Sequence, residues 1–561
     1  MKNALRLARL VNQPSGRDGP PDFAKASSWP VPDEGPSRSL QSVGGLGRPI
    51  SIPARPATFA KASAASRMQN CPPQLQRRRA VAPYQLLQAI LRGIIMRSQT
   101  ASWVLAALML VLLGGCLEEH LMWSPDGKRA AVIAKDGLHF CDPEGKLTPL
   151  LLPGVDRVAW FSNSQQLAVA RTRSVGDWAS IARAIGSARA AAITAKADEI
   201  WSKVEAGAQL DVLIKSAFLN GLKETQPLSI LLRERHGEAL KAKLSPGDWD
   251  SLKAAQVDLT DLLIVRVDGD QIRPGIVLHE GLEKIENIRV APGDRAIAFT
   301  TDLAPGNDKE CRLLVARVDI GGATTVAERT AFFPDWTPDC RSLVYVQAAQ
   351  GGAKEDLRLG TLMRRAVLDE HDGIKIQKDS EELAGLLFSN AARVRCLRDG
   401  RIMFNAVEFS LPVTNKDVEA EREKLFVLDP ARQSTLVRVI PRGEEENMPK
   451  NLTFFELSPD EQRVLVGGFE GEVSLLTIAT GDVGRLQKAG DYGLMAAPVW
   501  RNNDEITYAK RNPVENGKQP ARQAEIVLQE ISPAKGDHET VLSKDWSVEM
   551  LESIFSGSDK K

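Results

Sequence analysis

A ten-residue phrase recurs along the chain and limits the possible folds more than any other feature. Its fullest copy reads Trp123-Ser-Pro-Asp-Gly-Lys-Arg-Ala-Ala-Val132, a tight turn between two short apolar segments. Proline suits the second position of such a turn, aspartate bonds its own backbone, and glycine accepts a positive φ. Seven copies are recognisable, and they begin at Trp123, Trp160, Val290, Trp336, Cys396, Leu457 and Trp500.

The copies keep different parts of the phrase. Those from Trp336 and Leu457 keep Pro and Asp, the copy from Val290 keeps Pro, and the copy from Cys396 keeps Asp-Gly. The copies from Trp160 and Trp500 keep only the leading Trp and a polar turn. We interpret the leading Trp residues as packing between repeats. The residues that carry the repeat are Trp123, Asp126, Gly127, Trp160, Pro292, Trp336, Pro338, Asp339, Asp399, Gly400, Pro459, Asp460 and Trp500.

The spacing of the copies indicates what each repeat contains. Apart from one long gap, the leading residues lie about 37 to 61 residues apart, which suits four short strands per repeat. Four-stranded units of this length are typical of propeller blades arranged radially around an axis. The sequence therefore predicts an all-β fold, a β-propeller of about seven blades.

The phrase WSPDGK followed by a strand resembles the repeat of the TolB-type propellers, a WD40-like family of bacterial envelope proteins. The resemblance covers roughly residues 118–175 and 260–545. It implies a periplasmic, usually non-catalytic platform that binds protein or peptide partners at its central channel or top face. The chain departs from TolB because it has no recognisable amino-terminal α/β domain, so a role in the Tol system is not implied.

Residues 96–116, MRSQTASWVLAALMLVLLGGC, have the pattern of a bacterial signal peptide, with a basic start, an apolar run and small residues at the end. Leu113-Gly-Gly-Cys116 resembles the lipobox of bacterial lipoproteins, in which the Cys is acylated and becomes the mature N-terminus. A transmembrane helix is the alternative, but the apolar run is shorter than the roughly 20 residues that span a bilayer. We therefore expect a lipid anchor at Cys116 and a location in the bacterial cell envelope, facing the periplasm or the exterior.

Residues 1–95 do not read as a domain. They are rich in Pro, Ser, Gly and Arg, lack a helical or strand period, and contain the word FAKAS twice. We interpret them as upstream DNA translated from an early start codon. A start at Met68 and a genuine disordered arm are the alternatives.

The long gap between the second and third copies is helical in character. Apolar residues recur at helical spacing from Asp177 to Val204, and further helices are expected at 210–222, 227–244 and 250–256. Strand character returns at Leu262. The gap is therefore an α-helical insertion in the second blade, either a partner-docking surface or a subdomain without a ligand. The expected layout is 1–95 extension, 96–115 signal peptide, 116–174 blades one and two, 175–260 insertion, 261–545 blades two to seven, and 546–561 tail.

Charge and cysteine content narrow the function. The whole chain contains 72 basic and 72 acidic residues. The part from Cys116 onward contains 57 basic and 68 acidic residues, so its formal net charge is about −11. This acidity argues against nucleic-acid binding, which relies on Lys and Arg. Cys141, Cys311, Cys340 and Cys396 are too scattered to indicate a disulfide framework or a zinc site.

No motif in the mature chain indicates catalysis. It lacks a nucleophile elbow, HExxH, Walker A and dinucleotide-binding patterns, and its six histidines are dispersed. We therefore expect no catalytic, cofactor-binding or metal-binding residues, and a non-catalytic platform for an envelope protein or peptide. One alternative is a propeller enzyme, a lyase or hydrolase acting on polysaccharide or peptide in the channel. Another is a structural lipoprotein with no soluble ligand.

Overall fold

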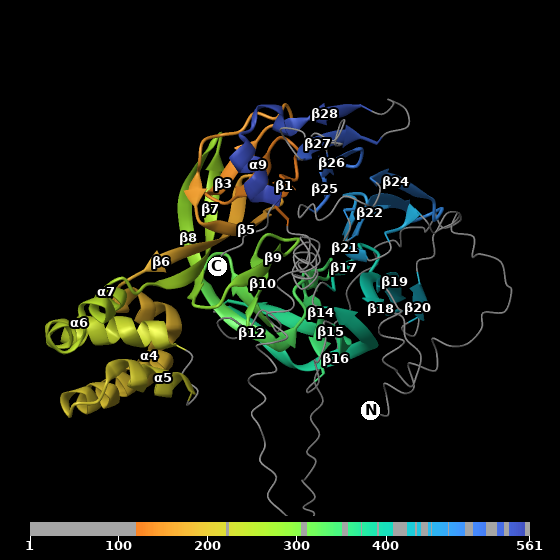
Figure 1. Cartoon of the computed structure of the whole chain (residues 1–561). Helices are drawn as coiled ribbons and strands as arrows, with labels where there is room; N and C mark the ends of the chain where they lie inside the picture. Colours follow the sequence, from red (N-terminus) through yellow and green to blue (C-terminus); the bar gives the residue numbers. More distant parts are fainter. Residues whose placement is uncertain are drawn as a thin grey trace, which may run out of the picture. The chain divides into compact units, whose positions relative to one another are not determined.

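A computed structural model describes most of the chain after residue 118 (Figure 1). The expected signal peptide and Cys116 lie outside the described residues. Within the described residues, no helix is long and apolar enough to span a membrane. The described ranges are 119–219, 224–303, 311–349, 357–371, 373–389, 392–407, 423–431, 435–438, 447–449, 452–468, 471–487, 497–511, 524–531 and 538–555.

The described strands group into antiparallel sets of four, which follow one another along the chain. Set 1 contains β1 (Leu121–Trp123), β2 (Ala130–Ala134), β3 (Gly137–Cys141) and β4 (Leu152–Pro153). Set 2 contains β5 (Val155–Trp160), β6 (Gln166–Val175), β7 (Val257–Asp268) and β8 (Gln271–Gly281). Set 3 contains β9 (Ile285–Val290), β10 (Ala296–Asp302), β11 (Cys311–Arg317) and β12 (Gly321–Thr330). Set 4 contains β13 (Asp335–Trp336), β14 (Ser342–Ala348), β15 (Leu357–Glu370) and β16 (Gly373–Ser389).

Set 5 contains β17 (Val394–Cys396), β18 (Ile402–Val407), β19 (Glu423–Asp429) and β20 (Thr435–Arg438). Set 6 contains β21 (Leu452–Leu457), β22 (Arg463–Gly468), β23 (Val473–Thr477) and β24 (Val483–Gln487). Set 7 contains β25 (Val499–Trp500), β26 (Glu505–Arg511), β27 (Ala524–Glu530) and β28 (Glu539–Val541).

Sets 3, 4 and 5 are hydrogen-bonded into one larger sheet, but only one residue pair joins each set to the next. These pairs are Thr330 with Gln347 and Leu387 with Val407. The prediction of a mostly β protein built from four-stranded antiparallel units is confirmed.

Every copy of the sequence phrase lies at the same place in its set. The leading residue ends the first strand, and the polar turn leads into the second strand. In the first copy the Ser124 hydroxyl donates to Asp126 Oδ1 at 2.6 Å, and Asp126 Oδ1 also accepts from the Lys128 backbone at 3.2 Å. Thr337 with Asp339 and Ser458 with Asp460 repeat the hydroxyl contact, each at 2.6 Å. This is the aspartate turn that the sequence predicts.

Apolar layers fill the space between consecutive sets, and the last set packs on the first. Each layer takes side chains from two neighbouring sets because successive residues of a strand point to opposite faces. One residue from each set of a pair illustrates the series: Phe140 with Leu263, Phe299 with Leu262, Trp336 with Val315, Phe404 with Val346, Phe455 with Met403, Trp500 with Leu465, and Trp123 with Ile526.

The leading tryptophans also form hydrogen bonds to the preceding set. The indole N–H groups of Trp160, Trp336 and Trp500 donate to backbone oxygens in the first strand of the set before, at 2.9, 3.1 and 3.2 Å. Trp123 lies in the first of the described sets, and its indole donates to a side chain, Thr507 Oγ1 in the second strand of the last set, at 2.9 Å. An indole hydrogen bond therefore links the two ends of the series as well, although with a different acceptor.

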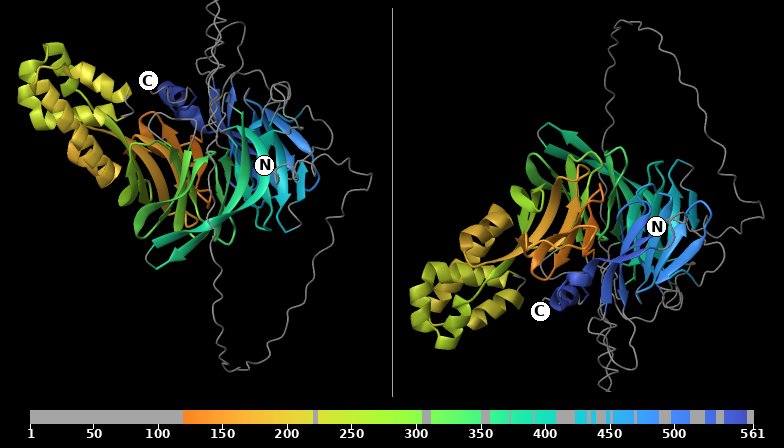
Figure 2. Two further views of the ribbon diagram at one scale, coloured as in Figure 1. Left: turned by 90° about the horizontal axis from the view of Figure 1, so that it is seen from below. Right: turned by 90° about the horizontal axis from the view of Figure 1, so that it is seen from above.

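The helical insertion stands between β6 and β7, the second and third strands of set 2. Its helices gather at the far end of these two strands and project beyond the sheets (Figures 1 and 2). Asp177 caps the first helix by accepting from the Ser180 backbone at 2.8 Å, as the sequence predicts. The helices are α4 (Trp178–Glu205), α5 (Leu210–Leu219), α6 (Thr225–Lys243) and α7 (Pro246–Lys253).

Three sequence expectations differ from the structure. Helix α7 begins at Pro246, four residues before the expected position 250, because the Ser245 side chain accepts from the Asp248 backbone and Pro246 suits the first turn. Strand β7 begins at Val257, five residues before the expected Leu262, since Val257 pairs directly with Val175. The expected tail contains helix α9 (Val548–Phe555), which packs on β2 and buries apolar side chains beside the first set.

Candidate functional site

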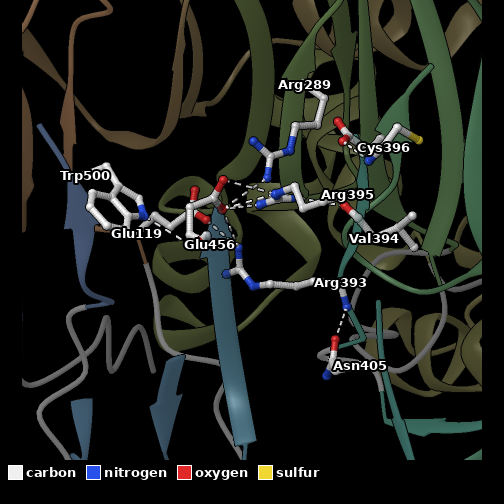
Figure 3. A network of polar contacts seen from close by, with 10 residues as sticks. Glu119, Arg289, Arg393, Val394, Arg395, Cys396, Asn405, Glu456 and Trp500 are labelled. Atoms are coloured by element: carbon white, nitrogen blue, oxygen red, sulfur yellow. Dashed lines mark hydrogen bonds and ion pairs between the residues drawn. The ribbon is translucent and has the colours of Figure 1, made fainter. Parts of the chain in front are cut away.

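Charged side chains from five sets converge beside the first strands, forming what we call the central charge cluster (Figure 3). In Figure 3 the side chains of the three arginines point toward Glu119 and Glu456. Because these residues come from positions hundreds of residues apart, the packing of the sets assembles the cluster. Its members are Glu119, Arg289, Asp335, Arg393, Arg395 and Glu456.

Arg395 and Glu456 form the most direct ion pair of the cluster. Arg395 Nε donates to Glu456 Oε1 at 3.1 Å and to Oε2 at 3.2 Å, and Arg395 Nη2 also contacts Oε2. The Arg395 side chain is 5% exposed, whereas Glu456 keeps 26% of its side chain accessible. Charge-assisted contacts of this kind are stronger than neutral hydrogen bonds. The pair therefore joins set 5 to set 6 and fixes the Glu456 carboxylate.

Arg393 is the most enclosed charge in the cluster, with 1% of its side chain exposed. Its guanidinium carbon lies 3.9 Å from the ring centre of Phe333 and 4.3 Å from that of Phe454. Its Nη1 donates to Glu119 Oε1 at 2.6 Å, and its backbone N–H donates to Asn405 Oδ1 at 2.7 Å. Two aromatic faces and one carboxylate thus compensate the burial of this cation.

Arg289 lies in the same cluster but forms no side-chain hydrogen bond to the described part of the chain. Its Nε and Nη2 atoms are buried and lack an acceptor there. The closest ion-pair contact is from Nη2 to Glu456 Oε2, at 3.7 Å. The side chain as a whole is 24% exposed. The backbone oxygen of Arg289 accepts from the indole of Trp336 at 3.1 Å.

Burial and the arginines act in opposite directions on the carboxyl groups. Burial raises the pKa of Glu119, but Arg393 and Arg289 outweigh it, so the pKa of Glu119 is lowered overall. Burial raises the pKa of Asp335 to about 6, although Arg289 and the backbone N–H of Cys396 oppose the rise. Burial raises the pKa of Glu456 to about 7, against Arg289 and Arg393. The hydrogen bonds that Arg395 donates to both oxygens of Glu456 favour its ionised form and oppose this rise.

The residues singled out from the sequence lie outside the central charge cluster, in the turns or at the ends of first strands. They organise the turns and the packing between sets. Arg289, Asp335, Arg395 and Glu456, which the sequence analysis missed, each stand immediately before the leading residue of a phrase copy. A comparison of that one position among the copies would have found four of the six cluster residues.

Histidines and cysteines do not assemble into a site within the described ranges. No group of three or more His, Cys, Asp or Glu residues there could hold a metal ion. The four described cysteines are free thiols, and burial raises the pKa of Cys141 to about 12.

Comparison with known proteins gives distant structural likeness only. No family model matches the sequence, and no curated protein matches it. TolB from Acinetobacter baumannii matches 48% of this chain at 14% identity with a TM-score of 0.32. Prolyl oligopeptidase B from Galerina marginata matches 82% of this chain at 10% identity with a TM-score of 0.40. The β-propeller domain of the Trilobed protease from Pyrococcus furiosus matches 52% of this chain at 12% identity with a TM-score of 0.27. The chain spans 57% of the length of both TolB and the oligopeptidase.

Proposed function

We propose that the seven sets of strands are the blades of a seven-bladed β-propeller, with the helical insertion in its second blade. We further propose that the protein is a non-catalytic lipoprotein of the bacterial cell envelope that binds a protein or peptide partner. The central charge cluster is the binding site in this proposal. In a propeller the first strands of the blades surround the axis, so side chains beside them face whatever enters there.

The observation that carries this proposal is the uncommitted guanidinium of Arg289. A structural ion-pair network uses its charges on one another, as Arg395 does with Glu456. Arg289 stands among these pairs with two buried nitrogens that lack an acceptor among the described residues, whereas Arg393 has one such nitrogen, Nε, and uses another on Glu119. Buried polar groups of native proteins nearly always have a partner. A partner molecule that supplies the acceptor accounts for this exception.

The proposed lipid anchor constrains where binding takes place. Cys116 precedes Glu119, a member of the cluster, by three residues, and an extended chain reaches only about 3.3–3.6 Å per residue. An acylated Cys116 would therefore keep the propeller close to the bilayer. Partners that are themselves attached to the membrane or the cell wall fit this position best.

Intact mass and membrane partitioning test the anchor. The mature protein is expected to begin at an acylated Cys116 and to partition with membranes, whereas Cys116→Ala leaves the chain unlipidated. A soluble chain that retains residues 1–95 would overturn this part of the proposal.

Site-specific photo-crosslinking in cells tests partner binding. One probe replaces Lys284, next to the strand that carries Arg289, where the side chain is 44% exposed. A second probe replaces Val212 on the insertion, where the residue is 53% exposed. A control probe replaces Ile320, which lies between β11 and β12 and is 52% exposed. We expect the first or second probe, and not the control, to capture an envelope protein. Turnover of an oligosaccharide or peptide that one change in the cluster abolishes would favour an enzyme instead.

A further inference from the structure

We infer that Arg289 is the receptor for a single carboxylate group on the partner, with Arg393 fixed beside it as a second positive charge. This inference rests on the proposed binding function and adds the chemical group that is recognised. It follows from which arginine nitrogens are occupied and from the balance of charge in the cluster.

The three arginines of the central charge cluster differ in how far they are committed. Arg395 places two of its nitrogens on Glu456, and it is 5% exposed. Arg393 is held between two aromatic rings and donates to Glu119. Arg289 makes no side-chain hydrogen bond to the described residues. Its Nε and Nη2 atoms are buried, so Nη1 is the nitrogen that an acceptor can reach through the accessible quarter of the side chain. Of the three, Arg289 is the one free to take an external acceptor.

Leaving a buried guanidinium without acceptors is unfavourable. A buried donor without an acceptor carries the full cost of its desolvation, and this cost is larger when the donor is charged. Glu456 does not relieve this cost, because its oxygen is 3.7 Å from Nη2 and is already bound by Arg395. Asp335 acts on Arg289 through charge, with no hydrogen bond between the two side chains. The site is thus pre-organised for an acceptor that arrives from outside.

The charge balance favours a carboxylate over a phosphate. The cluster contains three guanidinium groups and three carboxyl groups, and two of these carboxyl groups have raised pKa values. It therefore offers a small positive charge rather than the two charges that a dianion would need. A phosphate dianion would place two negative charges near Glu119, Asp335 and Glu456. A carboxylate brings one charge and, arriving at Nη1, meets the accessible arm of the planar arginine fork with a charge-assisted hydrogen bond. The carboxylate can come from a peptide C-terminus or from an acidic side chain, which share this chemistry.

Arginine-selective NMR of the mature chain, beginning at Cys116→Ala, tests the inference. Propionate is titrated to 50 mM at constant ionic strength, with methylphosphonate as the second probe, while the Nε–Hε resonances are recorded. The Arg289 resonance is identified by its loss in Arg289→Lys and Arg289→Gln. We expect it to shift saturably with propionate and much less with methylphosphonate. Because lysine keeps the charge but loses the fork, Arg289→Lys should weaken binding about tenfold, as judged from the remaining cluster resonances.

Arg295→Gln is the matched control, since it removes an exposed arginine from the hairpin that follows the same strand. It should leave propionate binding unchanged. Two acetylated hexapeptides that lack acidic side chains, one ending in a free carboxylate and one in an amide, then separate the sources of the group. A third, amidated and containing one aspartate, reports an acidic side chain. Competition with propionate by the first points to a C-terminus, and competition by the third points to a side chain.

Two results would overturn the carboxylate receptor. One is the absence of a saturable shift at the Arg289 resonance, and the other is equal propionate binding by the wild type and both Arg289 variants. Failure of the proposed function looks different, because crosslinking would then capture no partner while propionate still bound at Arg289. Conversely, a captured partner that binds Arg289→Gln and the wild type equally would leave the proposed function standing without this receptor.

Discussion

The phrase turns and the central charge cluster lie at neighbouring positions of the same first strands, but interactions of very different range hold them together. In the turns, Ser124 and Asp126 are two residues apart, and the same contact recurs in two other sets. In the cluster, Arg395 and Glu456 are 61 residues apart, and Glu119 and Arg393 are 274 apart. The turns are therefore properties of short sequences, whereas the cluster exists only when several sets have packed. Damage to the cluster should affect the whole assembly, and damage to one turn should remain local.

Replacing Arg393 with methionine should have the largest effect. The substitution removes the counter-charge of Glu119, whose side chain is only 25% exposed, and the contacts of the guanidinium with Phe333 and Phe454. We therefore expect a loss of about 3–5 kcal/mol in the free energy of unfolding. Urea denaturation measures it. Arg398→Met is the control, because Arg398 is 73% exposed and its ion pair with Glu461 is worth at most about 1 kcal/mol. Similar losses in both variants would show that Arg393 has no special role in the assembly.

Removing the helical insertion should have the next largest effect. Val175 and Val257 face each other across β6 and β7, so a short Gly/Ser turn can replace residues 176–256. The deletion exposes apolar side chains that α4 and α6 now cover, including Leu259, and we expect a loss of about 2–3 kcal/mol.

Thermal unfolding by calorimetry reports whether the remaining strands still unfold in one cooperative transition, as we expect. Leu228→Ala is the companion variant, since it weakens the separate apolar core of the helices while keeping them attached. A deletion variant that unfolds without cooperativity would show that the insertion belongs to the main core.

The pH dependence of stability tests the electrostatics of the cluster. The folded pKa values of Asp335 and Glu456, about 6 and about 7, lie above their ordinary values of 3.8 and 4.5. The folded protein therefore binds these protons more tightly than the unfolded chain does. The resulting stabilisation is complete below about pH 4 and is lost as the pH rises through 6 and 7.

We accordingly expect the melting temperature to fall between pH 5 and pH 8. Asp335→Asn removes one of the titrating groups and should make this fall smaller. Asp339→Asn is the control, because hydrogen bonds from Thr337 and Arg341 lower the pKa of Asp339, which then titrates below this range. An unchanged fall in Asp335→Asn would mean that other groups cause it.

The same difference in range explains what the sequence could predict. Proline, aspartate and glycine specify a turn within a few residues in five of the copies, and the leading Trp with a polar turn marks the other two. The seven first-to-second-strand turns and the helix cap at Asp177 were therefore predictable. Arg393 carries no local sign of its role, because the rings of Phe333 and Phe454 and the carboxylate of Glu119 reach it only after packing. Helix α9 was missed for a related reason. It is short, and its buried Leu551 and Ile554 depend on contacts with the first set.

Replacing Cys340 with glycine should give the smallest effect, and a favourable one. Cys340 occupies the turn position that Gly127 and Gly400 occupy in other sets, and it has a φ of 59°. A non-glycine residue in this left-handed region destabilises the folded state by about 1–2 kcal/mol. Glycine removes this strain, but it also increases the conformational entropy of the unfolded chain, which offsets part of the gain. We expect a net gain of about 0.5–1 kcal/mol in the free energy of unfolding.

Asp294 provides the matched control for that substitution, because it has nearly the same φ, 58°, in the turn of set 3. Its carboxylate accepts from the backbone N–H of Ser162 at 3.0 Å and from the Ser162 hydroxyl, contacts that link set 3 to set 2. Asp294→Gly relieves the same backbone strain but loses both hydrogen bonds, so it should not be stabilising. Urea denaturation of the two variants separates the backbone effect from the side-chain effect. If both glycines stabilised the protein equally, the contacts between neighbouring turns would contribute nothing, and the turns would be independent of one another.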